Sequence, residues 1–363
     1  MKKTQHFLTD TELRAKLSPE IAELKRRLKE KDQILENYKK EQGGLESFFR
    51  DVRETITPIE PLNNIYQVAS SASAIAVDSP CHAVIHSSDG HMGAVQDANE
   101  IEGINAFNPD ICKNRQIGFV LDFIKWISVK RKMYKIDNLT HIVTGDMISG
   151  DIHDELRVTN AFPTPIQVVE AGKLLAKQIT MLSQCFINVT VEFIVEDNHG
   201  RLTKKPQAKE AGMNTHNYVV GEIAKAYVRG IKNVTFNIYP MNEVVVHAAN
   251  RQYLICHGHN VRGWMGVPWY GIERKVGKES VARMQMIMED ISRAQKIGFH
   301  KYVFGHFHTP IDMDLYSCAG SVSGTDAFDH SAGRYSKPSQ PGWIIHPKKG
   351  EFDRTNFKLR DEL

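Results

Sequence analysis

The sequence has few cysteines, and none of them is placed as in a known cysteine motif. Five cysteines are scattered through 363 residues without a CxxC pair: Cys81, Cys112, Cys185, Cys256 and Cys318. Such spacing argues against a disulfide framework and favours a reducing compartment. We interpret the five thiols as structural.

Long apolar runs and a strong excess of one charge are also missing. No stretch approaches the roughly 18 uninterrupted apolar residues of a membrane span, and the start MKKTQHFLTDTEL has no apolar core of signal-peptide length. The formal net charge of +3 does not by itself identify a nucleic-acid-binding protein. We expect a cytoplasmic globular protein with no membrane segment, and we interpret the closing RDEL as a coincidence.

The sequence does contain a series of polar clusters, each of which follows a short apolar run. VIHSSDGHMG presents Asp89 and His91, and IVTGDMISG presents Asp146. FIVEDNHGR, LICHGHN and YVFGHFHTP continue the series with Asn198, His199, His257, His259, His306 and His308. The β-branched and aromatic runs predict strands, so each cluster should lie at the C-terminal end of a strand. In an open α/β sheet, functional sites form at this edge.

Strands and helices alternate from about residue 64, which predicts an α/β fold. The strand candidates are 83–87, 140–144, 190–195, 234–238, 244–248, 252–256 and 301–305. Helical patterns cover about 111–133, 165–183, 215–230 and 279–296, and Asn108 with Pro109 marks a helix start. Helices between the ligand-bearing strands predict a largely parallel core, and the later strands predict a second sheet packed on it. We interpret 319–342, which is rich in Gly, Ser and Pro, as a long loop near the last histidine pair.

The first 62 residues are predicted to be a helical segment, separate from a catalytic domain over 63–363. After Ser18 and Pro19, apolar residues recur at steps of three and four: Leu17, Ile21, Leu24, Leu28, Leu35 and Tyr38. The pattern fits a short coiled coil or an amphipathic helix on its own domain. We expect the coiled coil to make a homo-oligomer.

Asp, Asn and His side chains without cysteine form an oxygen and nitrogen ligand set. Such a set suits manganese, iron or zinc better than magnesium, because imidazole is a poor ligand for the hard ion. Seven ligands drawn from these nine side chains would be too many for one catalytic ion. Two ions about 3.5–4 Å apart can share one carboxylate and stabilise both the attacking and the leaving oxygen of a phosphoryl group. The ligand set therefore predicts a phosphoester hydrolase with two divalent ions, with Mn²⁺ as the first candidate and Fe²⁺ or Zn²⁺ as alternatives.

The ordered set DGH, GD, NH, H and GHFH resembles the calcineurin-like metallophosphoesterases over roughly residues 80–310. The resemblance implies an α/β fold of two packed mixed β-sheets flanked by helices, a metallophosphoesterase sandwich, with the N-terminal helices as an extension. It implies that one metal is held by Asp89, His91 and His308. The other metal would be held by Asn198, His257 and His306, with Asp146 bridging the two ions.

The same resemblance implies that a metal-bridging hydroxide attacks phosphorus in line. His199 would donate a proton to the leaving oxygen or stabilise charge on the phosphoryl group, a role that imidazole fills near neutral pH. His259 would lie behind the ligands or serve only locally. We expect His82 and His86 to be structural.

Departures from the family pattern bear on the substrate. GDMISGD has Ser149 and Gly150 where protein phosphatases carry the Asp and the phosphate-gripping Arg of GDxxDRG. Beyond His199, HGRLTKKPQAK gathers Arg201, Lys204 and Lys205 where a polyanionic backbone would enter, although a solvated basic loop is the alternative. Three residues are candidates for orienting the substrate or His199: His153, Asp154 and Asp151.

GDIHDEL and HGRLTKKP resemble the metallophosphoesterase domains of large-bacteriophage proteins that degrade DNA and are related to SbcD-type nucleases. This resemblance implies a deoxyribonuclease, in the host bacterial cytoplasm if a phage encodes it. A phosphatase and a cyclic-nucleotide or small-molecule phosphodiesterase are alternatives. An interaction protein tethered by its N-terminal helix, with incidental catalysis, is another.

Overall fold

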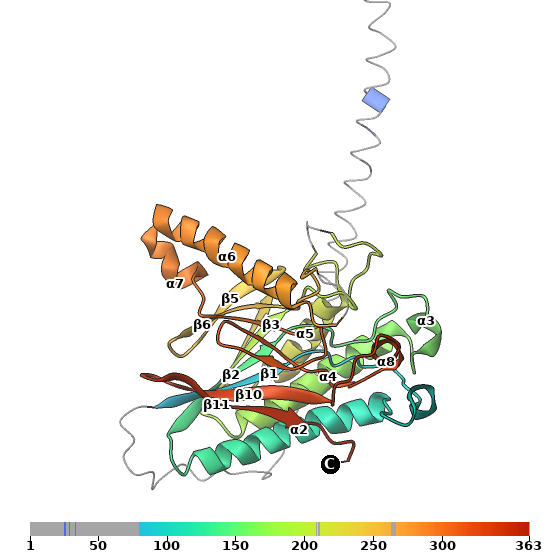
Figure 1. Ribbon diagram of the computed structural model, residues 1–363, viewed down its shortest axis with the longest axis horizontal. Coiled ribbons are helices and arrows are strands. Elements are labelled where there is room, and N and C mark those ends of the chain that lie inside the picture. The colour runs from blue at the N-terminus through green and yellow to red at the C-terminus, as the bar shows by residue number, and fades with distance from the viewer. Residues whose placement is uncertain are drawn as a thin grey trace, which may run out of the picture. The chain divides into compact units, whose positions relative to one another are not determined.

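The computed structural model describes residues 80–362, apart from 208, 210 and 263–265, and four isolated helical positions: Lys25, Arg26, Lys29 and Gln33. Contacts within the chain divide it into two compact units, Met1–Thr55 and Ile56–Leu363, and every element below belongs to the second unit (Figure 1). The predicted heptad face at 17–38 and the predicted boundary at 62–63 lie outside the described residues and stay predictions.

The elements alternate between strand and helix for the first half of this unit. The strands are β1 (Cys81–Ser87), β2 (Ile136–Val143), β3 (Asn188–Ile194), β4 (Val234–Tyr239), β5 (Glu243–Ala248), β6 (Arg251–Cys256), β7 (Lys301–Phe304), β8 (Ile311–Asp312), β9 (Tyr316–Cys318), β10 (Ser339–His346) and β11 (Gly350–Lys358). The helices are η1 (Ala98–Ile101), α2 (Pro109–Lys130), α3 (Leu156–Thr159), α4 (Thr164–Ser183), α5 (His216–Val228), α6 (Trp269–Glu289), η2 (Ile291–Arg293), α7 (Ala294–Ile297) and α8 (Ala327–Ser331).

The strands form two mixed sheets. The six-stranded sheet has the order β11-β10-β1-β2-β3-β4, in which β1 to β4 are parallel and β10 and β11 are antiparallel additions. The five-stranded sheet has the order β5-β6-β7-β9-β8, with a parallel centre and antiparallel edges. Both the parallel core and the second sheet are thereby confirmed. Parallel neighbours need crossover connections, which α2, α4 and α5 provide.

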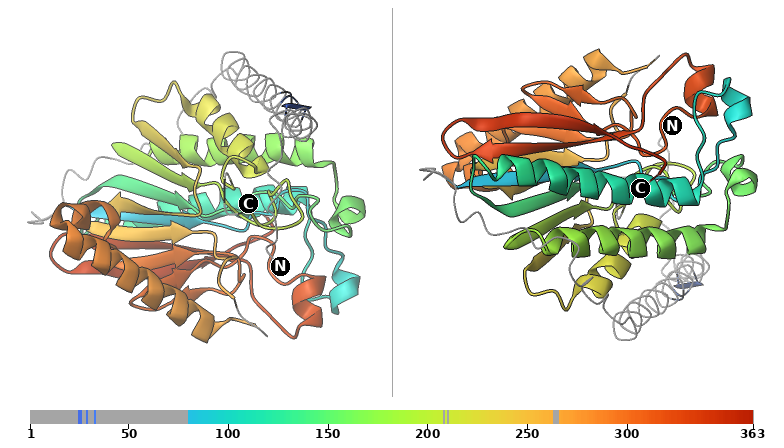
Figure 2. Two further views of the ribbon diagram at one scale, coloured as in Figure 1. Left: turned by 90° about the horizontal axis from the view of Figure 1, so that it is seen from above. Right: turned by 90° about the horizontal axis from the view of Figure 1, so that it is seen from below.

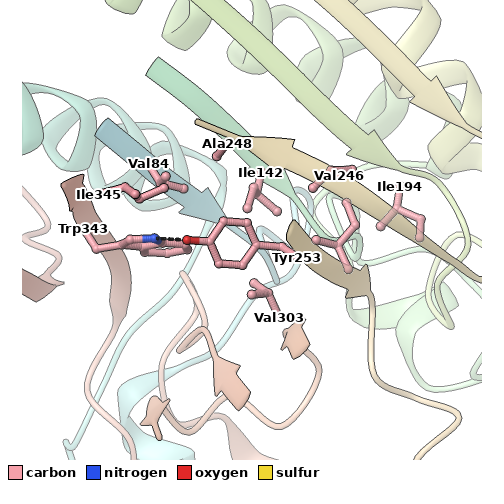
Figure 3. Close-up of a cluster of buried hydrophobic side chains, with 10 residues drawn as sticks. Val84, Ile142, Ile194, Val246, Ala248, Tyr253, Val303, Trp343 and Ile345 are labelled. Carbon is pink, nitrogen blue, oxygen red and sulfur yellow. Dashed lines mark hydrogen bonds between the residues drawn. The ribbon is translucent and has the colours of Figure 1, made fainter. Parts of the chain in front are cut away.

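The main core lies between the two sheets (Figure 3). Val84, Ile142 and Ile194 come from successive parallel strands of the first sheet. Tyr253 of β6 and Trp343 of β10 belong to the same cluster, and all five side chains are almost fully buried. The indole nitrogen of Trp343 donates to the Tyr253 hydroxyl at 3.1 Å, so the two large rings are satisfied inside the core. Burial of each such side chain contributes about 1.5–3 kcal/mol to the free energy of unfolding. The cluster therefore holds the two sheets together.

Helices cover both outer faces, so the unit has four layers (Figure 2). On the six-stranded side, Phe123 of α2 packs against Phe357 of β11, with ring centroids 5.9 Å apart. The start of α2 is as predicted, because the Asn108 side chain accepts from the first free backbone N–H groups. On the other side, Ile272 and Val276 of α6 contact the five-stranded sheet. Within the described residues, no helix combines the length and apolarity needed to cross a membrane.

Two predicted segments differ from the structure. The helix expected over 279–296 begins earlier, at Trp269, and ends at Glu289, because Asp290 is extended and its side chain accepts from the backbone N–H of Ser292. The loop expected over 319–342 contains α8 and the beginning of β10. Strand β10 pairs with β1 on one side and β11 on the other, so pairing partners distant in sequence fix it as a strand.

Candidate metal centre

The predicted polar clusters meet at one edge of the two sheets. Asp89 and His91 follow β1, Asp146 follows β2, and His257 follows β6. Asn198 and His199 come after β3, while β7 leads to His306 and His308. Backbone hydrogen bonds tie neighbouring turns together, as between Asp89 N and the Gly145 carbonyl at 3.1 Å. The expectation that each cluster lies at a strand's C-terminal end is confirmed.

Five of these residues have left-handed backbone conformations, which side chains other than glycine rarely adopt. The φ angles are 52° at Asp89, 45° at His91, 48° at Asp146, 71° at His306 and 57° at His308. Each costs roughly 1–2 kcal/mol relative to the right-handed region. Surrounding hydrogen bonds hold the turns, and the backbone N–H of His306 lies 3.1 and 3.0 Å from the two oxygens of Asp89. Strain that the fold sustains in this way is typical of functional sites.

Asp89, His91 and His308 form one group of candidate metal ligands, here called the His308 group. The Nε2 atoms of His91 and His308 are 3.1 Å apart, and His308 Nε2 lies 3.6 Å from Asp89 Oδ1. Two atoms that each bind one ion at about 2.0–2.2 Å lie about 3 Å from each other, so this spacing fits a shared ion. His308 Nδ1 lies 3.3 Å from Asp329 Oδ2, which orients the ring from behind.

Asp146, His257 and His306 form a second group, here called the His257 group. His257 Nε2 lies 2.9 Å from both Asp146 Oδ2 and Asn198 Oδ1. His257 Nδ1 is 2.7 Å from the Thr144 carbonyl oxygen. Because a carbonyl only accepts, Nδ1 must carry a proton, and Nε2 is left as the metal-binding atom.

Asp146 is placed to serve both groups. Its carboxylate belongs to the His257 group, and it also lies with His91 and His199 in a further set of mutually close donors. Asp146 Oδ1 accepts from the backbone N–H of His199 at 3.0 Å, which fixes the direction of the carboxylate. This position fits the bridging role that the sequence resemblance implies.

Burial and mutual contact shift the pKa values at this edge in opposite directions. Burial lowers the pKa of His91 and His306 well below the usual value, so both imidazoles are neutral, the form that can bind a metal ion. Burial acts the same way on His257, but Asp146 and other carboxylates outweigh it and raise the pKa to about 10. Burial also opposes the charge on His308, yet Asp329 and Asp89 raise its pKa to about 9. Metal binding would displace one proton from each of His257 and His308, at the ligating nitrogen.

His199 stands beside both groups. Its ring lies 4.7 Å from that of His91, and its Nδ1 is 2.6 Å from the Ser149 carbonyl oxygen. The backbone of Ser149 therefore orients the His199 ring, a role for which the sequence also offers Asp154 and Asp151. Asp154 instead lies at the surface, 3.4 Å from Lys204. With Nδ1 occupied, Nε2 is the nitrogen that remains for proton exchange.

Asp197, directly before Asn198, supports the site from behind although the sequence pattern gives it no role. It is almost fully buried, and it accepts from the backbone N–H groups of Asp146 at 2.8 Å and Gly200 at 3.0 Å. Burial, with the nearby charge of Asp146, raises its pKa to about 8. Gly145 is needed here, because its φ is 97° and a Cβ atom would come within 2.9 Å of the Asp197 Cβ.

The candidate ligands open onto a cleft of about 920 Å³. His91, Asp146, His199 and His306 contribute to its lining, and so does the predicted substrate residue His153, whose ring lies 5.9 Å from His199. The predicted cationic contacts are not among the lining residues: Arg201, Lys204 and Lys205. Arg201 donates from Nε to the Thr203 carbonyl oxygen of its own loop at 3.1 Å. Contact of these three side chains with a substrate stays a prediction.

The walls of the cleft include residues that the sequence reading missed. Phe328, Asp329 and Arg334 all come from the segment 319–342, predicted to be a long loop. Arg334 is the only lysine or arginine among the described lining residues. No local signal marks these positions, because their importance depends on contacts with His308 and the cleft.

The histidines considered secondary have local partners. His82 and His86 each bond a threonine of β2 or the turn after it, Thr140 at 2.9 Å and Thr144 at 2.8 Å. Neither histidine belongs to a candidate metal group among the described residues. His259 Nε2 lies 3.0 Å from Glu196 Oε1, in a contact that lacks hydrogen-bond alignment. His259 is in none of the candidate metal groups among the described residues.

No family model and no curated protein sequence matches the chain. Among solved structures, an archaeal phosphodiesterase matches with 10% identity and a TM-score of 0.32, over 76% of this chain and 99% of its own. Vps29 from Entamoeba histolytica, in complex with zinc, matches with 11% identity and a TM-score of 0.27, over 77% and 99%. The calcineurin-like phosphoesterase YfkN from Bacillus subtilis matches with 9% identity and a TM-score of 0.31, over 78% and 91%.

Proposed function

We propose that the protein is a phosphodiesterase that uses two divalent metal ions and acts on DNA. The observation that carries the proposal is the joining of the His308 group and the His257 group through Asp146, at the floor of a cleft. One three-donor group alone would fit many structural sites. Two adjoining groups with a shared carboxylate suit an ion pair that acts on one phosphoryl group.

The donor set fits manganese, iron or zinc. It contains imidazole nitrogens, carboxylate oxygens and the Asn198 amide oxygen. None of the five cysteines, which are buried free thiols, belongs to the groups. Two such ions, when bound, activate water and clamp the phosphoryl oxygens during an in-line displacement.

The chain's own residues supply orientation and proton transfer. Asp197 holds the backbone of Asp146, which keeps the shared carboxylate turned toward both groups. The Ser149 carbonyl fixes the ring of His199, so that Nε2 can give a proton to the oxygen that leaves phosphorus. The resemblance to calcineurin-like metallophosphoesterases supports the same roles.

DNA as the substrate is supported by the basic loop beyond His199. Lys204 and Lys205 are exposed, where cations can attract a phosphate backbone. The lining of the cleft favours a second candidate, a small phosphodiester, because Asp97, Glu100 and Glu155 make its walls acidic. A long polyanion would be repelled there unless its backbone runs along the basic loop.

One panel tests the proposal. Chelator-treated protein is reloaded with Mn²⁺, Fe²⁺, Zn²⁺ or Mg²⁺ and assayed on bis(4-nitrophenyl) phosphate, linear and circular DNA, and a phosphopeptide. We expect Mn²⁺ to restore hydrolysis of both diesters, with DNA preferred, and to raise the melting temperature, since an ion at about 100 times its Kd stabilises by about 2.7 kcal/mol. A metal-independent rate, or hydrolysis of the phosphopeptide alone, would reject the proposal.

A further inference from the structure

The wall of the cleft presents an aromatic ring and a guanidinium side by side. Phe328, in α8, lines the cleft and is 72% exposed, which is unusual for a phenylalanine next to buried ligands. The Cζ atom of Arg334 lies 4.9 Å from the centre of the Phe328 ring. Because the ring stays largely exposed beside Arg334, most of its surface is free to receive a second planar group.

Arg334 is held in place relative to the His308 group. Its Nη2 lies 2.9 Å from Asp329 Oδ1, and the other oxygen of Asp329 lies 3.3 Å from His308 Nδ1. Its backbone N–H donates to the Asp329 carbonyl at 2.8 Å, so both ends of the residue are anchored to α8. A guanidinium carries five N–H groups, and the contact with Asp329 is made by Nη2. Arg334 therefore offers N–H donors to the cleft. Asp329 and His308 stand between its guanidinium and the nearer candidate ion.

We infer that Phe328 and Arg334 bind one nucleotide unit of the substrate, with its base on the Phe328 ring and the phosphate next to the scissile one on Arg334. The inference rests on the proposed phosphodiesterase function and names the substrate class of that site. Every nucleobase has a flat face that stacks on an aromatic side chain, and a guanidinium matches phosphate oxygens in a two-point contact. Asp329 contacts both Arg334 and His308, so the guanidinium lies next to the His308 group, where the phosphate adjoining the reacting one would come.

The acidic walls explain why recognition would be limited to one unit. Asp97, Glu100 and Glu155 line the same cleft, and each would repel a further phosphate. A base can lie on Phe328 only after it leaves a helical stack. The site therefore fits a strand end or an unpaired nucleotide, and it disfavours the interior of a duplex.

Three chromogenic diesters separate the two contacts: methyl 4-nitrophenyl phosphate, thymidine 5′-(4-nitrophenyl phosphate) and the 3′-phosphorylated form of the latter. All three lose nitrophenolate to water, so only the recognised group differs. For the Mn²⁺-loaded full chain, kcat/KM should rise along the series. Stacking on one aromatic side chain corresponds to roughly 5- to 150-fold.

Each variant should remove one step of the series. Phe328→Ala should shrink the ratio between the first two substrates, while Phe328→Tyr keeps it. Arg334→Ala should shrink the ratio between the last two, and Arg334→Lys should restore part of it. Ratios within one variant cancel any general loss of activity. Tyr335→Ala and Lys337→Ala are matched controls, because these exposed residues line a neighbouring groove and not the cleft.

The outcomes distinguish this inference from the proposed function. If the wild-type protein hydrolyses none of the three diesters with Mn²⁺, the proposed function is wrong. If it hydrolyses all three diesters equally well, only the nucleotide site is wrong. Equal shrinkage of both ratios in the control variants would also overturn the assignment to Phe328 and Arg334.

Discussion

The His257 group and the His308 group perform the same task with different supports. His257 is fully buried, and the backbone carbonyl of Thr144, at the end of the parallel sheet, holds its Nδ1 at 2.7 Å. His308 keeps 16% of its side chain exposed, and the Asp329 side chain, in the short helix α8, holds its Nδ1 at 3.3 Å. One half of the centre is thus fixed by the fold itself, and the other by a replaceable side chain. This difference predicts that the two ions can be weakened separately.

The largest effect is expected where the two groups are joined. Asp146→Asn should abolish turnover, because the neutral amide is a poor ligand for the two ions that the carboxylate would share. The fold should survive, since asparagine tolerates the left-handed φ of 48° and its amide oxygen can still accept from His199. Turnover is measured on a small diester, with metal content and melting temperature as controls. A near wild-type rate with normal metal content would disprove the bridging role.

His199 lies beside both groups, so its removal tests whether it acts on the substrate or on the metals. His199→Ala should lower kcat by about 10²–10⁴-fold, the usual contribution of a general acid, while both ions stay bound. Metal analysis alongside single-turnover kinetics checks this. His153→Ala is the matched comparison, since its exposed ring lies 5.9 Å away, and its loss should be smaller. Loss of one ion from His199→Ala would make His199 a ligand.

Asp329→Asn breaks the side-chain support of one group only. It should weaken metal binding at the His308 group by roughly 10- to 100-fold, because a carboxylate behind a ligating imidazole increases its basicity. In a metal titration, one binding step should then move to roughly 10- to 100-fold higher metal concentration while the other stays unchanged. Glu196→Gln is the control, since this buried carboxylate contacts His259, outside both groups. Equal weakening of both steps would contradict the separate supports.

The halves of the centre also differ in how far the sequence predicts them. The ends of β1, β2, β3, β6 and β7 could be predicted, because each joins an apolar run to a polar cluster within a few residues. The resemblance then assigned Asp89, Asp146 and the histidines to two metal sites, and these side chains lie together in the His308 group and the His257 group. Left-handed backbone at these positions could not be predicted, since no glycine marks it.

The support of His308 could not be read from the sequence. Asp329 lies 21 positions beyond it, in a Gly, Ser and Pro-rich segment whose composition indicates a loop. The helical pattern at 279–296 shows a related limit. Val281 and Met284 of α6 and Ile291 of η2 recur at helical spacing, but they are 68%, 59% and 78% exposed. Periodicity therefore identified a helix there without identifying a buried face.

The smallest effect is expected from the basic loop, which belongs to neither group. Replacing Arg201, Lys204 and Lys205 with alanine should leave hydrolysis of a small diester nearly unchanged, because none of them lines the cleft. If the loop contacts DNA, binding should weaken and its salt dependence should flatten by up to about 0.9 in logarithmic slope per lost phosphate contact. DNA affinity is measured at several salt concentrations, with Lys337→Ala as a control for loss of one exposed charge elsewhere. An unchanged slope would leave the cleft as the sole contact with substrate and favour a small phosphodiester.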